Sequence, residues 1–222
     1  MNSTILSTKK LSVSQKELLL NAKVGFVEYD AIKIDYLDFL INTGFDYYLF
    51  TSQNAVNSYL KNISAIKAVQ KEVFCVGTKT KALLEANGFK VIEIESDANA
   101  LGKIIVEKHQ EKSFLYFTGN LRRDELPQEL KKYNVQYKEV EVYQTSLIEK
   151  RFNRQFDIIM FFSPSGVKAF VAQNDLENSI AFCIGETTAK EAKKYTEKVI
   201  IANKPTIENV LVQVIKHSSY ND

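Results

Sequence analysis

The chain is poor in the residues from which disulfide frameworks and metal sites are built. Its 222 residues include two cysteines and two histidines. Cys75 and Cys183 each lie inside an apolar stretch, "VFCVG" and "AFCIG", far apart in the sequence. This pattern predicts buried, reduced thiols and excludes a disulfide framework or a zinc cluster, with a catalytic thiol as the alternative. We expect no metal.

Charge of one sign and long apolar runs are also missing. The 29 basic and 27 acidic residues are scattered and leave a net charge of +2, which excludes the strongly basic face of a nucleic-acid-binding protein. No apolar run reaches the roughly 18 residues that a membrane span needs. The first residues, "MNSTILSTKKLS", lack the pattern of a secretory signal. We therefore expect a cytoplasmic protein that binds neither nucleic acid nor membrane.

The sequence does contain a long internal repeat. "FDYYLFTSQNAV" (45–56) matches "FDIIMFFSPSGV" (156–167), and "FCVGTKTKALLEANGFKVI" (74–92) matches "FCIGETTAKEAKKYTEKVI" (182–200). The offset of roughly 110 residues is too long for a solenoid repeat and is the length of a small domain. The repeat predicts two similar domains.

Short apolar runs alternate with segments of helical spacing in both copies. Runs that are apolar on both faces are typical of parallel strands covered by helices on both sides. Asn87-Gly88 is expected to end one helix; Asp124 is the expected N-cap of another, with Pro127 in its first turn. The fold class is α/β, with two similar doubly wound, flavodoxin-like parallel sheets. The expected strands are 46–51, 73–77, 90–94, 113–118 and 136–144 in the middle of the chain, and 156–162, 180–184 and 198–202 after it, followed by a helix near 207–216.

The C-terminal copy lacks two strands, and the N-terminus supplies matches for them. "STILSTKK" (3–10) is similar to "SFLYFTGN", and "KVGFVEYDAI" (23–32) to "VQYKEVEVYQT". One domain is therefore predicted to be discontinuous, from residues 1–30 plus 150–222, with residues 35–145 inserted as the other. The chain would cross near 31–37 and near 143–150, making a hinge, and a cleft between two domains is a favoured ligand site.

Small hydroxyl and glycine residues follow most of the predicted strands. Ligands of open parallel sheets bind beyond these carboxyl ends, where backbone N–H groups at helix starts attract anions. At any one position a serine or threonine is explained by N-capping alone, but the repetition favours a large polyanionic ligand. A nucleotide is not indicated, since neither Gly-x-Gly-x-x-Gly nor a phosphate-loop lysine occurs. The candidates are Thr51, Ser52, Gly77, Thr78, Thr80, Thr118, Gly119 and Asn120 in the middle domain, and Ser163, Ser165, Gly185, Thr187, Thr188, Ser7 and Thr8 in the other.

Four other residues have two interpretations each. Arg122 can bind a carboxylate bidentately or belong to a solvated basic turn. His109 and His217 end predicted helices and are expected at the surface rather than as ligands. Tyr143, at the end of a strand near a crossing, either packs or turns its hydroxyl toward the cleft.

The ordered set "LFTSQNAV", "VGTKT", "FTGNLRRDELPQELKKYNVQYKEVEVYQT", "FFSPSGVKAF" and "IGETTAKEA" resembles the uroporphyrinogen-III synthases over nearly the whole chain. The resemblance implies two α/β domains joined by a two-stranded linker. It implies a cyclising hydro-lyase without cofactor or metal. The substrate would be hydroxymethylbilane, closed to uroporphyrinogen III with loss of water and inversion of the last pyrrole ring, a step of haem and tetrapyrrole synthesis.

The resemblance also implies roles for particular residues. Tyr143, in the family's "YQT" segment, would assist departure of the substrate hydroxyl. Backbone N–H groups around 118–120 would hold substrate carboxylates, as would the hydroxyls of Ser52, Thr80, Ser163 and Thr188. Glu186 and Gln53 stand where the family often has proline. The alternative is a non-catalytic, two-domain protein that binds or senses a tetrapyrrole or another anion. A monomer is expected.

Overall fold

The computed structural model describes residues 4–63 and 71–219. The chain forms two compact units. We call Ile34–Thr145 the inserted unit, and Met1–Lys33 with Ser146–Asp222 the outer unit. The chain passes from one to the other within strands β3 (Ile32–Tyr36) and β8 (Gln136–Leu147), which are neighbours in one sheet.

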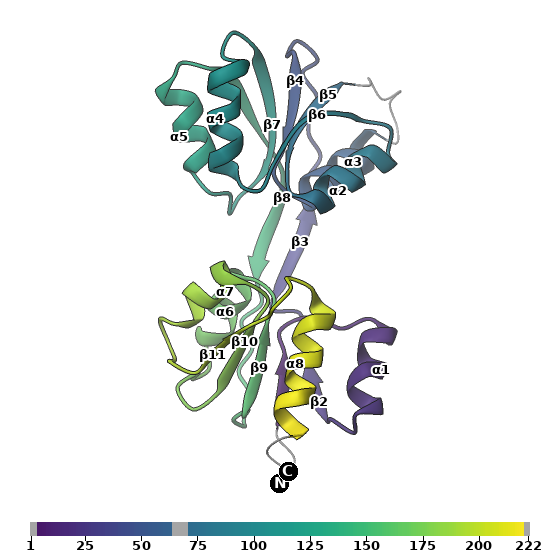
Figure 1. Cartoon of the computed structure of the whole chain (residues 1–222), viewed down its shortest axis with the longest axis vertical. Helices are drawn as coiled ribbons and strands as arrows, with labels where there is room; N and C mark the ends of the chain where they lie inside the picture. Colours follow the sequence, from purple (N-terminus) through teal and green to yellow (C-terminus); the bar gives the residue numbers. More distant parts are fainter. Residues whose placement is uncertain (1–3, 64–70, 220–222) are drawn as a thin grey trace. The chain divides into compact units, whose positions relative to one another are not determined.

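In the inserted unit, the strands other than β3 pair in parallel, and helices cover both faces of the sheet (Figure 1). Besides β3 and β8, the elements are β4 (Tyr47–Phe50), α2 (Gln53–Ile63), β5 (Glu72–Val76), α3 (Thr78–Ala86), β6 (Lys90–Glu95), α4 (Ala98–Lys108), β7 (Ser113–Gly119) and α5 (Glu125–Lys132). The strand order is β3-β8-β7-β4-β5-β6. Alternate residues of one strand face opposite sides: Tyr48 and Phe50 pack under α2 and α3, whereas Leu49 packs under α4 and α5.

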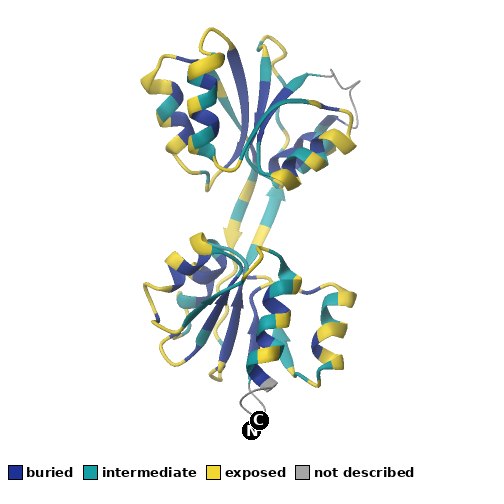
Figure 2. Ribbon diagram, in the orientation of Figure 1, coloured by how far each residue is buried: buried dark blue, intermediate teal, exposed yellow. Residues whose placement is uncertain are grey.

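The outer unit repeats this design from both ends of the chain. Its elements are β1 (Ile5–Ser7), α1 (Val13–Asn21), β2 (Phe26–Glu28), β9 (Ile158–Phe161), α6 (Pro164–Val171), β10 (Ile180–Cys183), α7 (Glu186–Ala192), β11 (Val199–Ile201) and α8 (Ile207–Ser219). The sheet has the order β11-β10-β9-β1-β2, and its neighbouring strands are parallel. Helices α6 and α7 cover one face; α1 and α8 cover the other. The strands are the buried centre of each unit, while the outward sides of the helices are exposed (Figure 2).

The two sheets have the same order once the repeat is applied. Strands β6-β5-β4-β7-β8 of the inserted unit correspond to β11-β10-β9-β1-β2 of the outer unit. The predicted α/β class with two similar, doubly wound parallel sheets is confirmed. The N-terminal segments form the strands that the repeat assigns to them, although the match begins at Ser3, outside the described residues. No helix in the described ranges is long and apolar enough to cross a membrane.

One polar contact is repeated along with the strands. The Asp46 carboxylate accepts hydrogen bonds from the backbone N–H (2.8 Å) and the hydroxyl (2.9 Å) of Ser113 at the start of β7. In the outer unit Asp157 accepts the same two bonds, at 2.7 and 2.9 Å, from Thr4 before β1. Each pair fixes the amino end of one strand against its neighbour.

Two predicted helix ends are confirmed: Gly88 follows α3 with a positive φ of 81°, and Asp124 is the N-cap residue of α5. Asp124 makes no side-chain cap on α5, because its backbone is helical there and its carboxylate binds Arg122 instead. His109 and His217 are half-buried rather than surface residues. Their rings pack edge-on against Phe74 (centroids 4.9 Å apart) and Phe182 (5.6 Å).

Candidate functional site

The predicted hydroxyl and glycine residues do follow the carboxyl ends of the parallel strands. In the inserted unit they come after β4 and β5 and at the end of β7; in the outer unit they come after β1, β9 and β10. Their exposure differs. Thr78 and Thr187 are exposed, Thr51, Ser52, Gly77, Ser163, Ser165 and Gly185 are intermediate, and Thr80, Thr118 and Thr188 are buried.

Tyr143 sits at a bulge in β8. Strand β7 pairs Thr118 with Glu141 and then Gly119 with Tyr143, so Val142 is the extra residue. Successive residues of a regular strand point to opposite faces, yet Val142 and Tyr143 both pack on the core beneath α2 and α3. The bulge therefore turns the Tyr143 ring onto Gly119. A Cβ on Gly119 would lie only 2.4 Å from Cζ of that ring, so glycine is required here by the close approach.

Ser52 holds the hydroxyl of Tyr143. The Ser52 Oγ donates to the Tyr143 hydroxyl at 3.2 Å and accepts from the Ala55 backbone N–H at 3.1 Å. A serine hydroxyl has a single proton to give. Because Ser52 uses this proton in the hydrogen bond to Tyr143, the O–H group of Tyr143 is available to donate to another acceptor.

Thr51, next to Ser52, is linked to a tyrosine that sequence reasoning missed. Its hydroxyl lies 2.9 Å from the hydroxyl of Tyr116, on the neighbouring strand β7. Burial raises the pKa of Tyr116 above its ordinary value. The Tyr116 hydroxyl is therefore a neutral hydrogen-bonding group that orients Thr51. A polar tip in the apolar stretch "SFLYFTG" was the only sequence signal for it.

Arg122 is engaged by carboxylates of its own unit. Its guanidinium binds Glu139 of β8 through two nitrogens, Nε and Nη2, the latter at 3.1 Å, and binds Asp124 through Nη1. The side chains of Arg122 and Glu139 are 27% and 26% exposed. The bidentate carboxylate contact expected of Arg122 thus exists, but within the chain. Its role toward a ligand stays a prediction.

Asn120 uses its side chain to hold the end of β8. Its amide accepts from the Thr145 backbone N–H at 2.8 Å and donates to the Thr145 carbonyl at 3.2 Å. The loop after β7 is thereby fixed to β8 two residues beyond Tyr143. The same strand end carries Gly119, so this loop, Tyr143 and Ser52 form one local site in the inserted unit.

In the outer unit, the polar residues at the strand ends bind the backbone of their own unit. Ser163 is the N-cap of α6 and accepts the Gly166 N–H at 3.0 Å. Thr8 is buried and donates to the Met160 carbonyl at 2.7 Å. Gly185 begins α7 without a side-chain cap. Hydrogen bonding within the unit accounts for Ser163 and Thr8, and their role toward a ligand stays a prediction.

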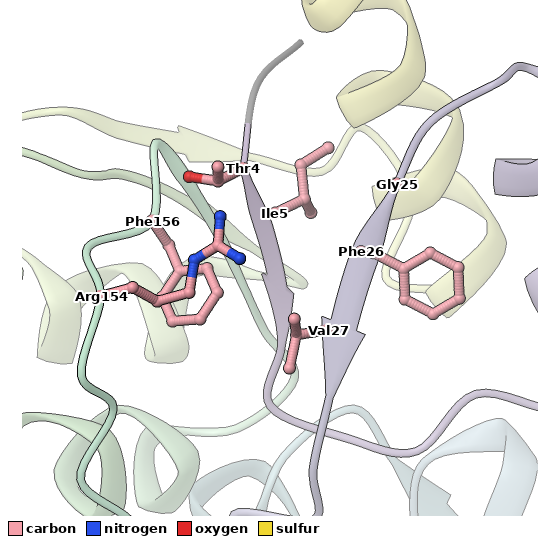
Figure 3. A pocket seen from close by; sticks show the side chains of 7 residues that line it. All are labelled: Thr4, Ile5, Gly25, Phe26, Val27, Arg154 and Phe156. Atoms are coloured by element: carbon pink, nitrogen blue, oxygen red, sulfur yellow. The ribbon is translucent and has the colours of Figure 1, made fainter.

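The structure also bears on three other possible kinds of site: the two thiols, a metal site and a surface hollow. Burial raises the pKa of the Cys75 thiol to about 11 and that of Cys183 to about 12, which confirms the prediction of buried thiols and disfavours a catalytic one. Within the described residues, no three His, Cys, Asp or Glu side chains are grouped to hold a metal ion. A hollow of about 310 Å³ lies at the amino ends of β1 and β2, away from the predicted strand ends (Figure 3). Arg154 and Phe156 form one side of it and Gly25–Val27 the other.

Fold and site together define a class: two-unit α/β proteins with small polar residues at the ends of parallel strands. The family model for uroporphyrinogen-III synthase HemD matches residues 19–211, and the chain belongs to that family. The porphyrin biosynthesis protein HemD of Ruminiclostridium josui is 27% identical over 187 residues, which are 76% of this chain. The chain spans 37% of the length of that relative.

Two solved structures share the fold over the whole chain. The uroporphyrinogen-III synthetase of Helicobacter pylori 26695 has a TM-score of 0.70 at 22% identity and covers 98% of this chain and 100% of its own. A mutant uroporphyrinogen III synthase of Thermus thermophilus also has a TM-score of 0.70, at 12% identity, covering 99% and 100%. At these identities the likeness concerns the fold.

Proposed function

We propose that the chain cyclises hydroxymethylbilane to uroporphyrinogen III, with loss of water and inversion of the last pyrrole ring. Family membership supports this reaction. The observation that supports a role for a particular residue is the Tyr143 hydroxyl, which Ser52 binds, with the Tyr143 ring lying against Gly119. The enzyme would be a cofactor-free, cytoplasmic lyase that acts as a monomer.

Tyr143 is the residue we assign to the chemical step. The substrate hydroxyl leaves as water, so it needs a proton or a hydrogen bond as its bond to carbon breaks. Because Ser52 is the donor in their contact, the O–H group of Tyr143 is available to donate to the substrate hydroxyl. A positioned acid of this kind contributes typically 10²–10⁴-fold to a rate. Loss of water leaves an azafulvene, from which a spirocyclic pyrrolenine forms, fragments and closes in the inverted sense.

Binding would rest on donors at the strand ends. The acetate and propionate side chains of the substrate are anionic, and hydroxyls and helix N-termini stabilise such groups without a basic surface. The exposed Thr78 and Thr187 and the half-buried Ser163 are accessible for this role, whereas the Ser52 hydroxyl already donates its single proton to Tyr143. The buried Thr80 and Thr188 would contribute chiefly by fixing the backbone around them.

A turnover assay with freshly made hydroxymethylbilane tests the proposal. The oxidised porphyrin isomers are separated by chromatography, and we expect mostly isomer III. Isomer I alone, the product of uncatalysed closure, from folded protein would leave the alternative of a non-catalytic tetrapyrrole-binding protein.

The role of Tyr143 is tested with a matched pair of variants. Tyr143→Phe is expected to lower turnover by about 10²-fold with little change in thermal unfolding. Tyr137→Phe removes another hydroxyl from the same strand, one that donates to the Pro127 carbonyl, and should leave turnover near wild type. Equal turnover in both variants would remove Tyr143 from the mechanism.

A further inference from the structure

The bulge that presents Tyr143 is held by a buried serine. Ser58, in the middle of α2, is 1% exposed and donates its hydroxyl proton to the backbone carbonyl of Val142. Val142 is the extra residue of the bulge, directly before Tyr143. The same carbonyl also accepts the Leu37 N–H at 2.9 Å. The carbonyl is thus satisfied without Ser58, and the serine bond adds orientation.

Residues at the start and in the middle of α2 bind Tyr143 and the residue before it. Ser52, directly before α2, binds the phenolic hydroxyl of Tyr143, and Ser58, six residues later, binds the carbonyl of Val142. Six residues of helix separate these points by about 9 Å along a rigid axis. The hydroxyl of Tyr143 and the backbone directly before it are therefore both positioned by α2 and the residue at its start.

We propose that Ser58 is a positioning residue for Tyr143. Its hydrogen bond fixes the orientation of the bulge, and the bulge sets where the Tyr143 hydroxyl lies on Gly119. The inference rests on the proposed function of Tyr143. A misplacement of about 1 Å at a reacting group can cost on the order of 10²-fold in rate, so a loosened bulge should slow turnover without removing the acid.

Ser58→Ala provides the test, with Ser179→Ala as its matched control. Ser179 is also a buried serine whose hydroxyl binds a backbone carbonyl, that of Phe156 at 2.7 Å, but in the outer unit. We expect Ser58→Ala to lower kcat by about tenfold with KM changed less than twofold, and Ser179→Ala to leave both near wild type. Equal kcat in the two variants would overturn the proposal.

A double-mutant cycle separates positioning from a general loss of structure. In the Tyr143→Phe background, Ser58→Ala is expected to cause no further loss of kcat, because the group it orients is gone. A further tenfold loss there would show that Ser58 acts by another route and would also overturn the proposal. Should Ser58→Ala fail to fold, Ser58→Cys, of similar shape and with a weak donor, takes its place in the same cycle.

The same variants distinguish this inference from the proposed function. Absence of isomer III from the wild-type chain refutes the function itself. Normal turnover of Tyr143→Phe refutes the role of the tyrosine. When Tyr143→Phe is slow, the positioning role by itself is refuted either by normal turnover of Ser58→Ala or by a further tenfold loss in the double variant.

Discussion

Substituting Gly119 by alanine places a methyl group directly against the Tyr143 ring. The added Cβ would lie 2.4, 2.5 and 2.9 Å from three ring carbons. Carbon atoms in contact are normally about 3.5–4.0 Å apart, so the ring has to retreat by about 1 Å or more. Gly119 does not have a positive φ, so backbone strain is not part of the effect.

The expected cost of Gly119→Ala has two parts. Overpacking of this kind costs about 1–3 kcal/mol of stability, which thermal or denaturant unfolding measures. A shift of about 1 Å at the Tyr143 hydroxyl is expected to lower kcat by roughly 10²-fold and to reduce the share of isomer III. The rate and the isomer ratio are measured in the same turnover assay.

Gly25→Ala is the matched control, because a Cβ there meets nothing within 4 Å. It should change neither stability nor turnover appreciably. A Gly119→Ala variant that folds and keeps wild-type kcat and wild-type isomer ratio would refute the reasoning, since the position of the Tyr143 hydroxyl would then not limit the reaction.

Three further predictions concern ion pairs, acid stability and the thiols. Arg122→Ala should cost about 2 kcal/mol in unfolding free energy, because it leaves the half-buried Glu139 unpaired; a double-mutant cycle with Glu139→Gln should show coupling, and additive effects would contradict the contact. Hydrogen bonds from backbone N–H and hydroxyl groups lower the pKa of Asp46 and of Asp157. Both carboxylates therefore stabilise the fold fully above their ordinary pKa of about 3.9. This stabilisation is lost as the pH falls through the lowered pKa values. Replacing both with Asn should flatten the dependence of unfolding on pH below about 4, whereas an unchanged dependence would contradict this. Because burial raises its pKa, Cys75 should react with a thiol reagent at pH 8 only after denaturation, and rapid labelling of native protein would show otherwise.

The strands that the N-terminus contributes were predictable because equivalent sequences form equivalent strands. The match of "STILSTKK" to "SFLYFTGN" identified β1 as the counterpart of β7, and in the structure β1 lies beside β9 as β7 lies beside β4. The residues near 31–37 predicted a crossing, and the family resemblance implied a two-stranded linker; the stretch forms strand β3, beside β8 at the edge of the sheet of the inserted unit. Its pairing depends on where β8 runs, which local sequence does not encode.

The side-chain partners of the site were less accessible to sequence reasoning. The bulge at Val142 arises from the register between β7 and β8, and no residue pattern in "KEVEVYQT" predicts it. Arg122 was identified as a carboxylate-binding group, but Glu139 lies 17 residues away, on strand β8. The sequence does not distinguish Ser58 from other polar residues of a helix, because its partner, the Val142 carbonyl, lies on a distant strand. Contacts across elements are set by packing, which a single sequence does not specify.

The split design of the outer unit has a consequence for the order in which the chain folds during synthesis. Residues 34–145 are complete before β9 is made, so the inserted unit can fold first, whereas Thr4 must wait for Asp157, 153 residues later. Once folded, the inserted unit holds β3 and β8 side by side in its sheet. That brings the flanking segments together and shortens the loop that β1 and β9 have to close, which reduces its entropic cost. We therefore expect the insertion to act as the nucleus on which the outer unit assembles.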